Sequence, residues 1–127
     1  ENGSDVVFAA AGGTGMGVYQ TAADMGILAI GVDSNQNYMQ PGTMLTSMYK
    51  KVGLAAYNSF DAAMNGTWAP GFSVNGVAED GVGAAMDDYN ADLVSPEMLA
   101  SVATARAGII DGSIVVHDYM SDNTCPL

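Results

Sequence analysis

Two polar features follow short apolar runs in this sequence, at points where a ligand site could be built. The run "VVFAAA" (6–11) leads into "GGTGMG", and the run "ILAIGV" (27–32) ends at Asp33. A glycine turn that enters a helix can present backbone N–H groups to a ligand. An ionised carboxylate only accepts hydrogen bonds, and its two oxygens suit a pair of hydroxyl groups such as a ribose diol. The pattern favours a ligand site, with a plain tight turn and a loop-bracing or helix-capping aspartate as simpler interpretations.

The glycine cluster does not complete the common nucleotide-binding motifs. Counted from Gly13, the third glycine of a G-x-G-x-x-G pattern falls on Val18, although Asp33 stands about where the acidic residue of that pattern is expected. No Gly-Lys-Ser/Thr sequence follows, so a Walker loop is also absent. A Rossmann-like nucleotide-dependent enzyme therefore remains only as a weaker alternative.

The three cations of the sequence are Lys50, Lys51 and Arg106. Lys50 ends the third apolar segment, so a binding role and a solvated surface position are equally supported. Lys51 and Arg106 are interpreted as surface residues, and the adjacent carboxylates at 87 and 88 as a solvated loop pair.

The residue types needed for covalent or metal chemistry are sparse. No Ser or Cys nucleophile has an identifiable partner, and His117 is expected to face solvent on a strand. Cys125 is the single cysteine, which excludes an internal disulfide, and no Cys/His cluster could hold zinc. The sequence thus predicts no catalytic residue, no metal and no cofactor.

Bulk properties bound the class of protein. The 127 residues suffice for one domain, 49% of them are hydrophobic, and no apolar run approaches the roughly 18 residues of a membrane span. A net charge of −11 argues against binding to nucleic acid or anionic lipid. The chain starts a few residues before a strand, without a basic leader or an initiator methionine, so we expect a piece of a longer protein.

The elements that would position these residues follow an α/β pattern. Strand 6–11, helix 16–25 with Gly26 after it, and strand 27–32 have the size of one βαβ unit. Both strands are apolar throughout, as in a parallel sheet covered on both faces. A loop with a Pro41-Gly42 turn then leads to a third strand at 44–49.

The second half of the chain carries two more helices. An amphipathic pattern predicts a helix over 51–64, and a glycine-rich stretch over 72–86 contains one or two short strands. Ser95 as N-cap, Pro96 at the first helical position and Gly112 as terminator delimit the last helix, before a final strand at 113–119. Trp68 and Phe72 could line a groove or cover the core.

Four ordered segments carry a resemblance to a known family. They are "DVVFAAAGGTGMGVYQTA", "AIGVDSNQ", "PGTMLTSMYKKV" and "GVAEDGVGAAM…VSPEMLASVATARAGIIDGSIVV". Together they resemble the C-terminal half of the basic membrane protein (BMP) family, the purine-nucleoside-binding lipoproteins of bacterial ABC importers. The resemblance implies a Rossmann-like three-layer α/β/α lobe with a mostly parallel sheet, as in type I periplasmic binding proteins.

The resemblance also implies roles for individual residues. The backbone of Gly12-Gly13-Thr14 should approach the ligand, Asp33 should accept hydrogen bonds from ribose hydroxyls, and Lys50 should donate to the ribose from the hinge side. The segment around Gly81 should lie near the cleft. Asn35 departs from the family, which usually has Asp there; a charge beside the site is lost.

Family members have two lobes joined by a hinge, which divides this chain into three parts. Residues 1–49 would form a βαβ portion of the second lobe, residues 50–71 the hinge and a helix that packs on the first lobe, and residues 72–127 the return to the second lobe. The helix at 51–64 would then present an apolar face without its partner, which favours association. We expect either a cleaved portion still bound to its N-terminal lobe, or a chain that forms a homodimer or refolds this helix onto its own sheet.

The resulting expectation is a binding protein and not an enzyme. It would be part of the substrate-binding component of an ABC importer, capturing a purine nucleoside, with an ABC permease as its partner and an extracytoplasmic, periplasmic or lipid-anchored location. A sugar- or autoinducer-binding type I protein is the alternative in the same class, because an aspartate at a strand end serves any polyol.

Overall fold

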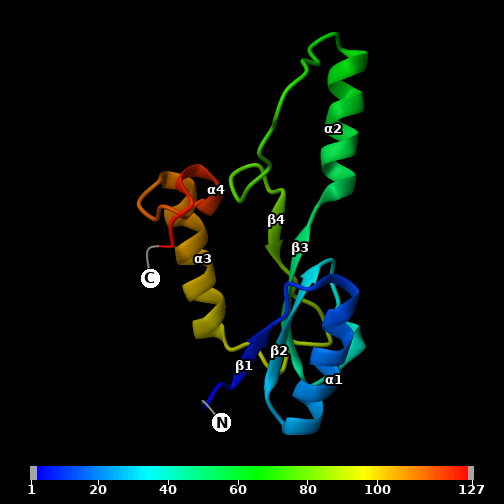
Figure 1. Cartoon of the computed structure of the whole chain (residues 1–127), viewed down its shortest axis with the longest axis vertical. Helices are drawn as coiled ribbons and strands as arrows, with labels where there is room; N and C mark the ends of the chain where they lie inside the picture. Colours follow the sequence, from blue (N-terminus) through cyan, green and yellow to red (C-terminus); the bar gives the residue numbers. More distant parts are fainter. Residues whose placement is uncertain (1–2, 126–127) are drawn as a thin grey trace.

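The computed structural model describes residues 3–125 and shows an open four-stranded sheet with helices on both faces (Figure 1). The strand order is β1 (Val6–Phe8), β2 (Leu28–Asp33), β3 (Met44–Lys50) and β4 (Val82–Ala84). The first three strands are parallel and β4 runs antiparallel to β3. The expected α/β class with a mostly parallel sheet is confirmed.

The first βαβ unit contains the hydrophobic core. A short 3-10 turn, η1 (Gly12–Thr14), leads into α1 (Gly15–Met25), which ends where Gly26 takes a left-handed conformation with φ of 67°. Ala22 and Tyr19 of α1 are buried against Ala29 of β2 and Met44 of β3. β1 is shorter than the predicted 6–11 because the N–H of Ala11 turns back to the carbonyl of Ala9 at 2.9 Å.

The opposite face of the sheet lies toward α3 (Pro96–Asp111). Ile30 and Leu45, next in sequence to Ala29 and Met44, alternate to this face. They line a groove of about 480 Å³ whose other wall includes Met98 and Val102 of α3. Helix α1 and helix α3 therefore cover opposite faces of the sheet, which gives the three layers.

Both predicted ends of α3 are confirmed. Ser95 is its N-cap, with the side-chain oxygen accepting a hydrogen bond from the N–H of Met98 at 3.2 Å, and Pro96 follows at the first helical position. Gly112 ends the helix in the left-handed region with φ of 82°. Local capping chemistry alone fixes this element.

Helix α2 (Val52–Met64) extends away from the sheet (Figure 1). None of residues 51–80 is buried. Along α2 and the segment that returns from it, large apolar side chains are exposed, among them Tyr57, Phe60, Met64, Trp68 and Phe72. The prediction of a helix here is confirmed. Ala55 and Ala62 line a hollow with Trp68 and Phe72 of the returning segment, whereas the large apolar side chains of the helix stay exposed.

The final strand predicted at 113–119 is wrong. After Gly112 the chain turns back, and the N–H of Ile114 donates to the carbonyl of Gly108 at 2.9 Å. Val115 and Val116 are exposed, and a short helix, α4 (Tyr119–Asp122), follows. β-branched residues form a strand only where a neighbouring strand pairs with them, and this segment has none among residues 3–125.

Two smaller points complete the fold. The glycine-rich stretch 72–86 contains one strand, β4, out of the one or two expected. Between Gly3 and Cys125, no helix combines the length and the apolar character that crossing a bilayer requires.

Candidate functional site

Asp33 and Lys50 form an ion pair at the carboxyl edge of the sheet. Asp33 is the last residue of β2 and Lys50 the last of β3, and these neighbouring parallel strands pair Asp33 with Tyr49. The Lys50 Nζ lies 2.6 Å from the Asp33 Oδ1, and each side chain is about half exposed, 52% and 54%. Because parallel strands end at the same edge, this is where open α/β sheets bind ligands. Two sequence-predicted site residues are thus in direct contact.

The backbone at Asp33 turns sharply out of the strand. Its φ of 70° lies in the left-handed region, and the N–H of Ser34 donates to the carbonyl of Val32 at 2.8 Å. This conformation costs a residue other than glycine about 1 kcal/mol, and aspartate tolerates it better than most residues do. Such conformations persist where the surroundings hold them, which is common at ligand sites.

A buried polar network provides that support. Gln36 Oε1 accepts hydrogen bonds from the Val32 N–H at 2.9 Å and from the Tyr19 hydroxyl at 2.8 Å. The Gln36 N–H donates to Ser47 Oγ at 3.0 Å, and that hydroxyl donates to Asn37 Oδ1 at 2.7 Å. Burial raises the pKa of Tyr19, so its phenol stays a donor at neutral pH. The loop after Asp33 is therefore tied to β3 and α1.

The same loop is also tied to the chain after β4. Asn35 Nδ2 donates to Asp87 Oδ2 at 2.6 Å, and Asn37 Nδ2 donates to the same oxygen at 3.2 Å. The hydrogen bond from Asn35 holds the pKa of Asp87 below its ordinary value. Buried Asn90 donates to the carbonyls of Leu45 and Ala85 at 2.9 and 3.0 Å. Asp87, interpreted from the sequence as a solvated loop residue, therefore braces the Asp33 loop.

The glycine turn lies after the end of β1, at the same edge of the sheet where β2 ends at Asp33. Gly12 has φ of 55°, and both Gly12 and Gly13 are exposed, with open space where a Cβ would stand. The turn is closed by hydrogen bonds from the N–H groups of Thr14 to Ala11 and of Gly15 to Gly12 and Gly13. The backbone of the turn is accessible to a ligand, as the sequence interpretation requires.

Gly81 has a structural reason to be glycine. Its N–H donates to the carbonyl of Gly76 at 2.9 Å, and a Cβ would collide with the backbone of Asn75. Its own carbonyl accepts from the N–H of Lys51 at 2.8 Å. Gly81 and Lys50 line a small hollow of about 200 Å³ at the base of α2, so this glycine lies near Lys50.

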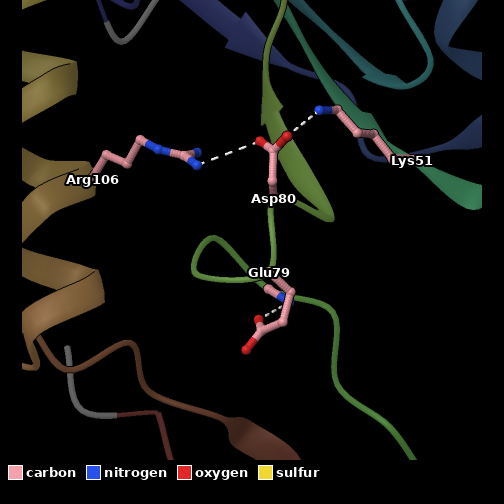
Figure 2. A network of polar contacts seen from close by, with 5 residues as sticks. Lys51, Glu79, Asp80 and Arg106 are labelled. Carbon is pink, nitrogen blue, oxygen red and sulfur yellow. Dashed lines mark hydrogen bonds and ion pairs between the residues drawn. The ribbon is translucent and has the colours of Figure 1, made fainter. Parts of the chain in front are cut away.

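Asp80 is a residue that sequence reasoning missed. Its carboxylate pairs with Lys51 and lies 3.4 Å from the Arg106 Nη2 of α3 (Figure 2). The hydrogen bond between Lys51 and Asp80 raises the pKa of the lysine and lowers that of the aspartate. With three cations and 14 acidic residues, the sequence indicates that each cation pairs with a carboxylate. It does not indicate which carboxylate, because each cation has many candidate partners.

Within residues 3–125, no group of three or more His, Cys, Asp or Glu side chains could hold a metal ion. His117 is not on a strand; its Nε2 lies 2.9 Å from the Thr124 carbonyl and 3.4 Å from Asp122 Oδ1 near the C-terminus. Cys125 is a free, exposed thiol. The sheet edge itself carries the Asp33 carboxylate, which can accept hydrogen bonds, the Lys50 ammonium, which can donate them, and the accessible backbone of the glycine turn.

An open α/β sheet with polar groups at the carboxyl ends of its strands is the architecture of a ligand-binding lobe. The family described as "ABC transporter substrate-binding protein PnrA-like" matches residues 1–117, and the chain belongs to that family. The resemblance to the BMP family is thereby confirmed.

Two curated relatives illustrate the match. The chain is 30% identical over 116 residues to basic membrane protein C of Borreliella burgdorferi, covering 89% of this chain and 32% of the relative. It is 30% identical over 133 residues to the "ABC transporter nucleoside-binding protein BmpA" of Lactococcus lactis, covering 91% of this chain and 36% of the relative. The chain thus spans about a third of the length of these relatives.

Solved structures show the same fold. A transcriptional activator of the comK gene from Bacillus halodurans superposes with a TM-score of 0.77 at 21% identity, over 89% of this chain and 39% of that one. An ABC transporter solute-binding protein from Aeropyrum pernix gives a TM-score of 0.63 at 21% identity, over 94% and 42%. These likenesses establish the lobe architecture.

Proposed function

We propose that this chain forms the second lobe of a substrate-binding component of an ABC importer, and that the lobe contributes to the capture of a purine nucleoside. The observation that carries the proposal is the Asp33–Lys50 pair at the carboxyl edge of the sheet, 2.6 Å apart and open to solvent. Family membership supports the transport role. The nucleoside-binding name of the Lactococcus relative supports the ligand class.

The pair suits a neutral polyol. The Asp33 carboxylate would accept hydrogen bonds from the two ribose hydroxyls, and Lys50 would donate to a hydroxyl or ring oxygen. In the free lobe the two side chains neutralise each other, so a neutral ligand can join them without leaving a charge unpaired. The backbone of the turn at 12–14 would form a further wall, and Gly81 would lie at the hinge side.

A second lobe would complete the site. We propose that residues 1–49 and 72–127 form the lobe described above, and that residues 50–71 form the hinge and a helix that packs on an N-terminal lobe of the same protein. The exposed apolar side chains of α2, such as Tyr57 and Phe60, support this division. Closure of the two lobes would bury the ligand. Without its partner lobe, this surface would favour a homodimer.

The cellular setting follows from the same proposal. A substrate-binding component delivers its ligand to an ABC permease, so the protein would work outside the cytoplasm, in a periplasm or anchored as a lipoprotein. The acidic surface would keep it soluble there and needs no substrate to explain it. We propose no catalytic step.

Isothermal titration calorimetry tests the proposal. Inosine, guanosine, adenosine and ribose should be titrated into this chain and into a two-lobed protein that contains it. Saturable nucleoside binding without turnover, much tighter in the two-lobed protein, is the expected result. Binding of ribose alone would replace the nucleoside with a sugar ligand, and NAD binding or product formation would replace the transport role with an enzymatic one.

A further inference from the structure

Residues 52–80 form an arm that leaves the sheet after β3 and returns to it before β4 (Figure 1). None of the arm residues is buried, and only Val77, near the end of the arm, lines the apolar groove beside α3, so packing against the lobe holds little of the arm in place. Its direction must then be set where the two passages between arm and sheet lie side by side. Those passages are residues 50–52 and 80–82, which are joined by the pairing of Lys50 with Val82.

Lys51 is the residue that joins the sheet to the arm, between the end of β3 and the start of α2. Its N–H donates to the carbonyl of Gly81 at 2.8 Å, and its own carbonyl accepts the first hydrogen bond of α2, from Ala55 at 3.1 Å. Its ammonium lies 5.9 Å from the centre of the Tyr49 ring. Moving Lys51 relative to Gly81 would therefore move the start of α2.

Asp80 is presented by a turn that closes on itself. The Gly81 N–H donates to the carbonyl of Gly76, and the Gly76 N–H donates to the Glu79 carboxylate at 2.9 Å (Figure 2). The backbone of Asp80 is in the left-handed region, with φ of 56°. From this turn it contacts Lys51, at the junction of β3 and α2, and Arg106, on α3.

We propose that Asp80 is a positioning residue that latches the arm. Through Lys51 and Arg106 it fixes the angle between α2, the sheet and α3. Lys50, the neighbour of Lys51, carries the predicted ligand contact, so the angle also sets where any lobe docked on α2 meets the Asp33–Lys50 pair. That last consequence rests on the proposed function, whereas the latch itself does not.

The chain offers a natural probe pair for the arm angle. Trp68, the single tryptophan, lies in the arm, and Cys125, the single cysteine, lies beyond α4 and is exposed. With an acceptor dye on Cys125, time-resolved energy transfer from Trp68 measures the distribution of distances between arm and lobe. We expect Asp80→Asn and Lys51→Gln each to broaden that distribution, and 1 M salt to broaden it in the unaltered protein, since exposed ion pairs are screened.

Asp80→Asn is the sharper of the two substitutions because asparagine also tolerates the left-handed region, so only the charge is lost. The matched control is Asp61→Asn, on α2, whose carboxylate makes no hydrogen bond or ion pair within residues 3–125. The Asp80→Asn/Lys51→Gln double variant should be no broader than Asp80→Asn alone, because Asp80→Asn already removes the pair with Lys51 as well as the pair with Arg106. Unchanged distributions in both single variants, or fully additive broadening in the double variant, would overturn the latch.

A ligand readout separates the latch from the proposed function. In a two-lobed protein, nucleoside affinity should fall about two- to fivefold in Asp80→Asn and stay unchanged in Asp61→Asn, in line with the modest strength of exposed ion pairs. If the unaltered two-lobed protein binds no nucleoside, the proposed function fails while the energy-transfer result still decides the latch. A broadened distance distribution in Asp80→Asn together with unchanged nucleoside affinity would confine the latch to the free lobe. It would remove the proposed consequence of the latch for the ligand site.

Discussion

The amide of Asn35 donates a hydrogen bond to the carboxylate of Asp87 across 2.6 Å, although 52 residues separate them in the chain. This contact depends on asparagine at position 35, because its side-chain amide is the donor. An aspartate at this position would place two carboxylates together unless another group or a proton intervened.

We therefore expect Asn35→Asp to lower stability at pH 7. Like charges at this separation repel, and the donor that depresses the pKa of Asp87 would be gone. The loss should shrink as pH falls toward 4, because one carboxylate then takes a proton. Urea unfolding at both pH values checks this, with Asn35→Ala as the control for the lost hydrogen bond. Equal stability of Asn35→Asp and the unaltered chain at pH 7 would contradict the role of this contact.

The hydroxyl of Ser47 joins the two halves of the buried network. Ser47→Ala would leave the half-buried Gln36 N–H and the fully buried Asn37 Oδ1 without their partner. We expect a loss of about 1–3 kcal/mol in the free energy of unfolding, measured by denaturant titration. Ser59→Ala is the control, since this exposed hydroxyl bonds only within α2, and it should change stability by about 0.5 kcal/mol or less. Comparable effects of the two substitutions would disprove the importance of the network.

Much of the fold follows from local chemistry that a sequence displays. Ser95, Pro96 and Gly112 delimit α3 because capping depends on neighbours within four residues. Apolar runs between glycine turns gave β1 to β3 for a similar reason, and the parallel register then brought Asp33 and Lys50 together.

The parts that could not be predicted depend on distant partners. Val115 and Val116 have strand-forming side chains, but a strand also needs a neighbour, and the chain folds back on Gly108 instead. Asn37 and Asn90 look like loop residues in sequence, yet both are buried because Asn37 accepts from Ser47 of β3 and Asn90 donates to the carbonyl of Leu45. Asp80 was missed for the same reason.

Gly31 is required by the close approach of β2 to β3. A Cβ at Gly31 would lie 2.5 Å from the Ser47 Oγ, inside the buried network. Gly31→Ala should therefore cost about 1–3 kcal/mol through overpacking, as measured by thermal or urea unfolding. Gly17→Ala is the matched control: a Cβ at this exposed position of α1 meets nothing within 4 Å, so stability should rise by about 0.5–1 kcal/mol. If Gly31→Ala were also neutral or stabilising, the tight β2–β3 contact would be refuted.

Asp80 should make stability depend on acid pH. Its pKa is lower in the folded protein than in the unfolded chain, chiefly through the hydrogen bond from Lys51. Its stabilising contribution is therefore present above the unfolded pKa of about 4 and is lost as pH falls through the lower folded pKa. Relief of the −11 net charge at low pH acts in the opposite direction for the whole protein.

The comparison of two variants separates these effects. Urea unfolding midpoints of Asp61→Asn and Asp80→Asn should be measured at pH 7, 5, 4 and 3. We expect Asp61→Asn to be the more stable variant near neutral pH, and the difference between the two variants to vanish toward pH 3. A difference that is constant with pH would exclude the ion pair as its source.

Asp33 should dominate ligand affinity if the site works as proposed. In a two-lobed protein, Asp33→Ala removes the acceptor of the sugar hydroxyls and leaves those donors unpaired in a closed site, so nucleoside binding should weaken by about 2–4 kcal/mol in calorimetry. Lys50→Met should also weaken binding, and the double variant should lose less than the sum, because each single substitution leaves the other charge without its partner at 2.6 Å. Asp24→Asn, at an exposed position of α1, controls for the loss of one negative charge. An unchanged dissociation constant in Asp33→Ala would remove this carboxylate from the site, and with it the observation on which the nucleoside proposal depends.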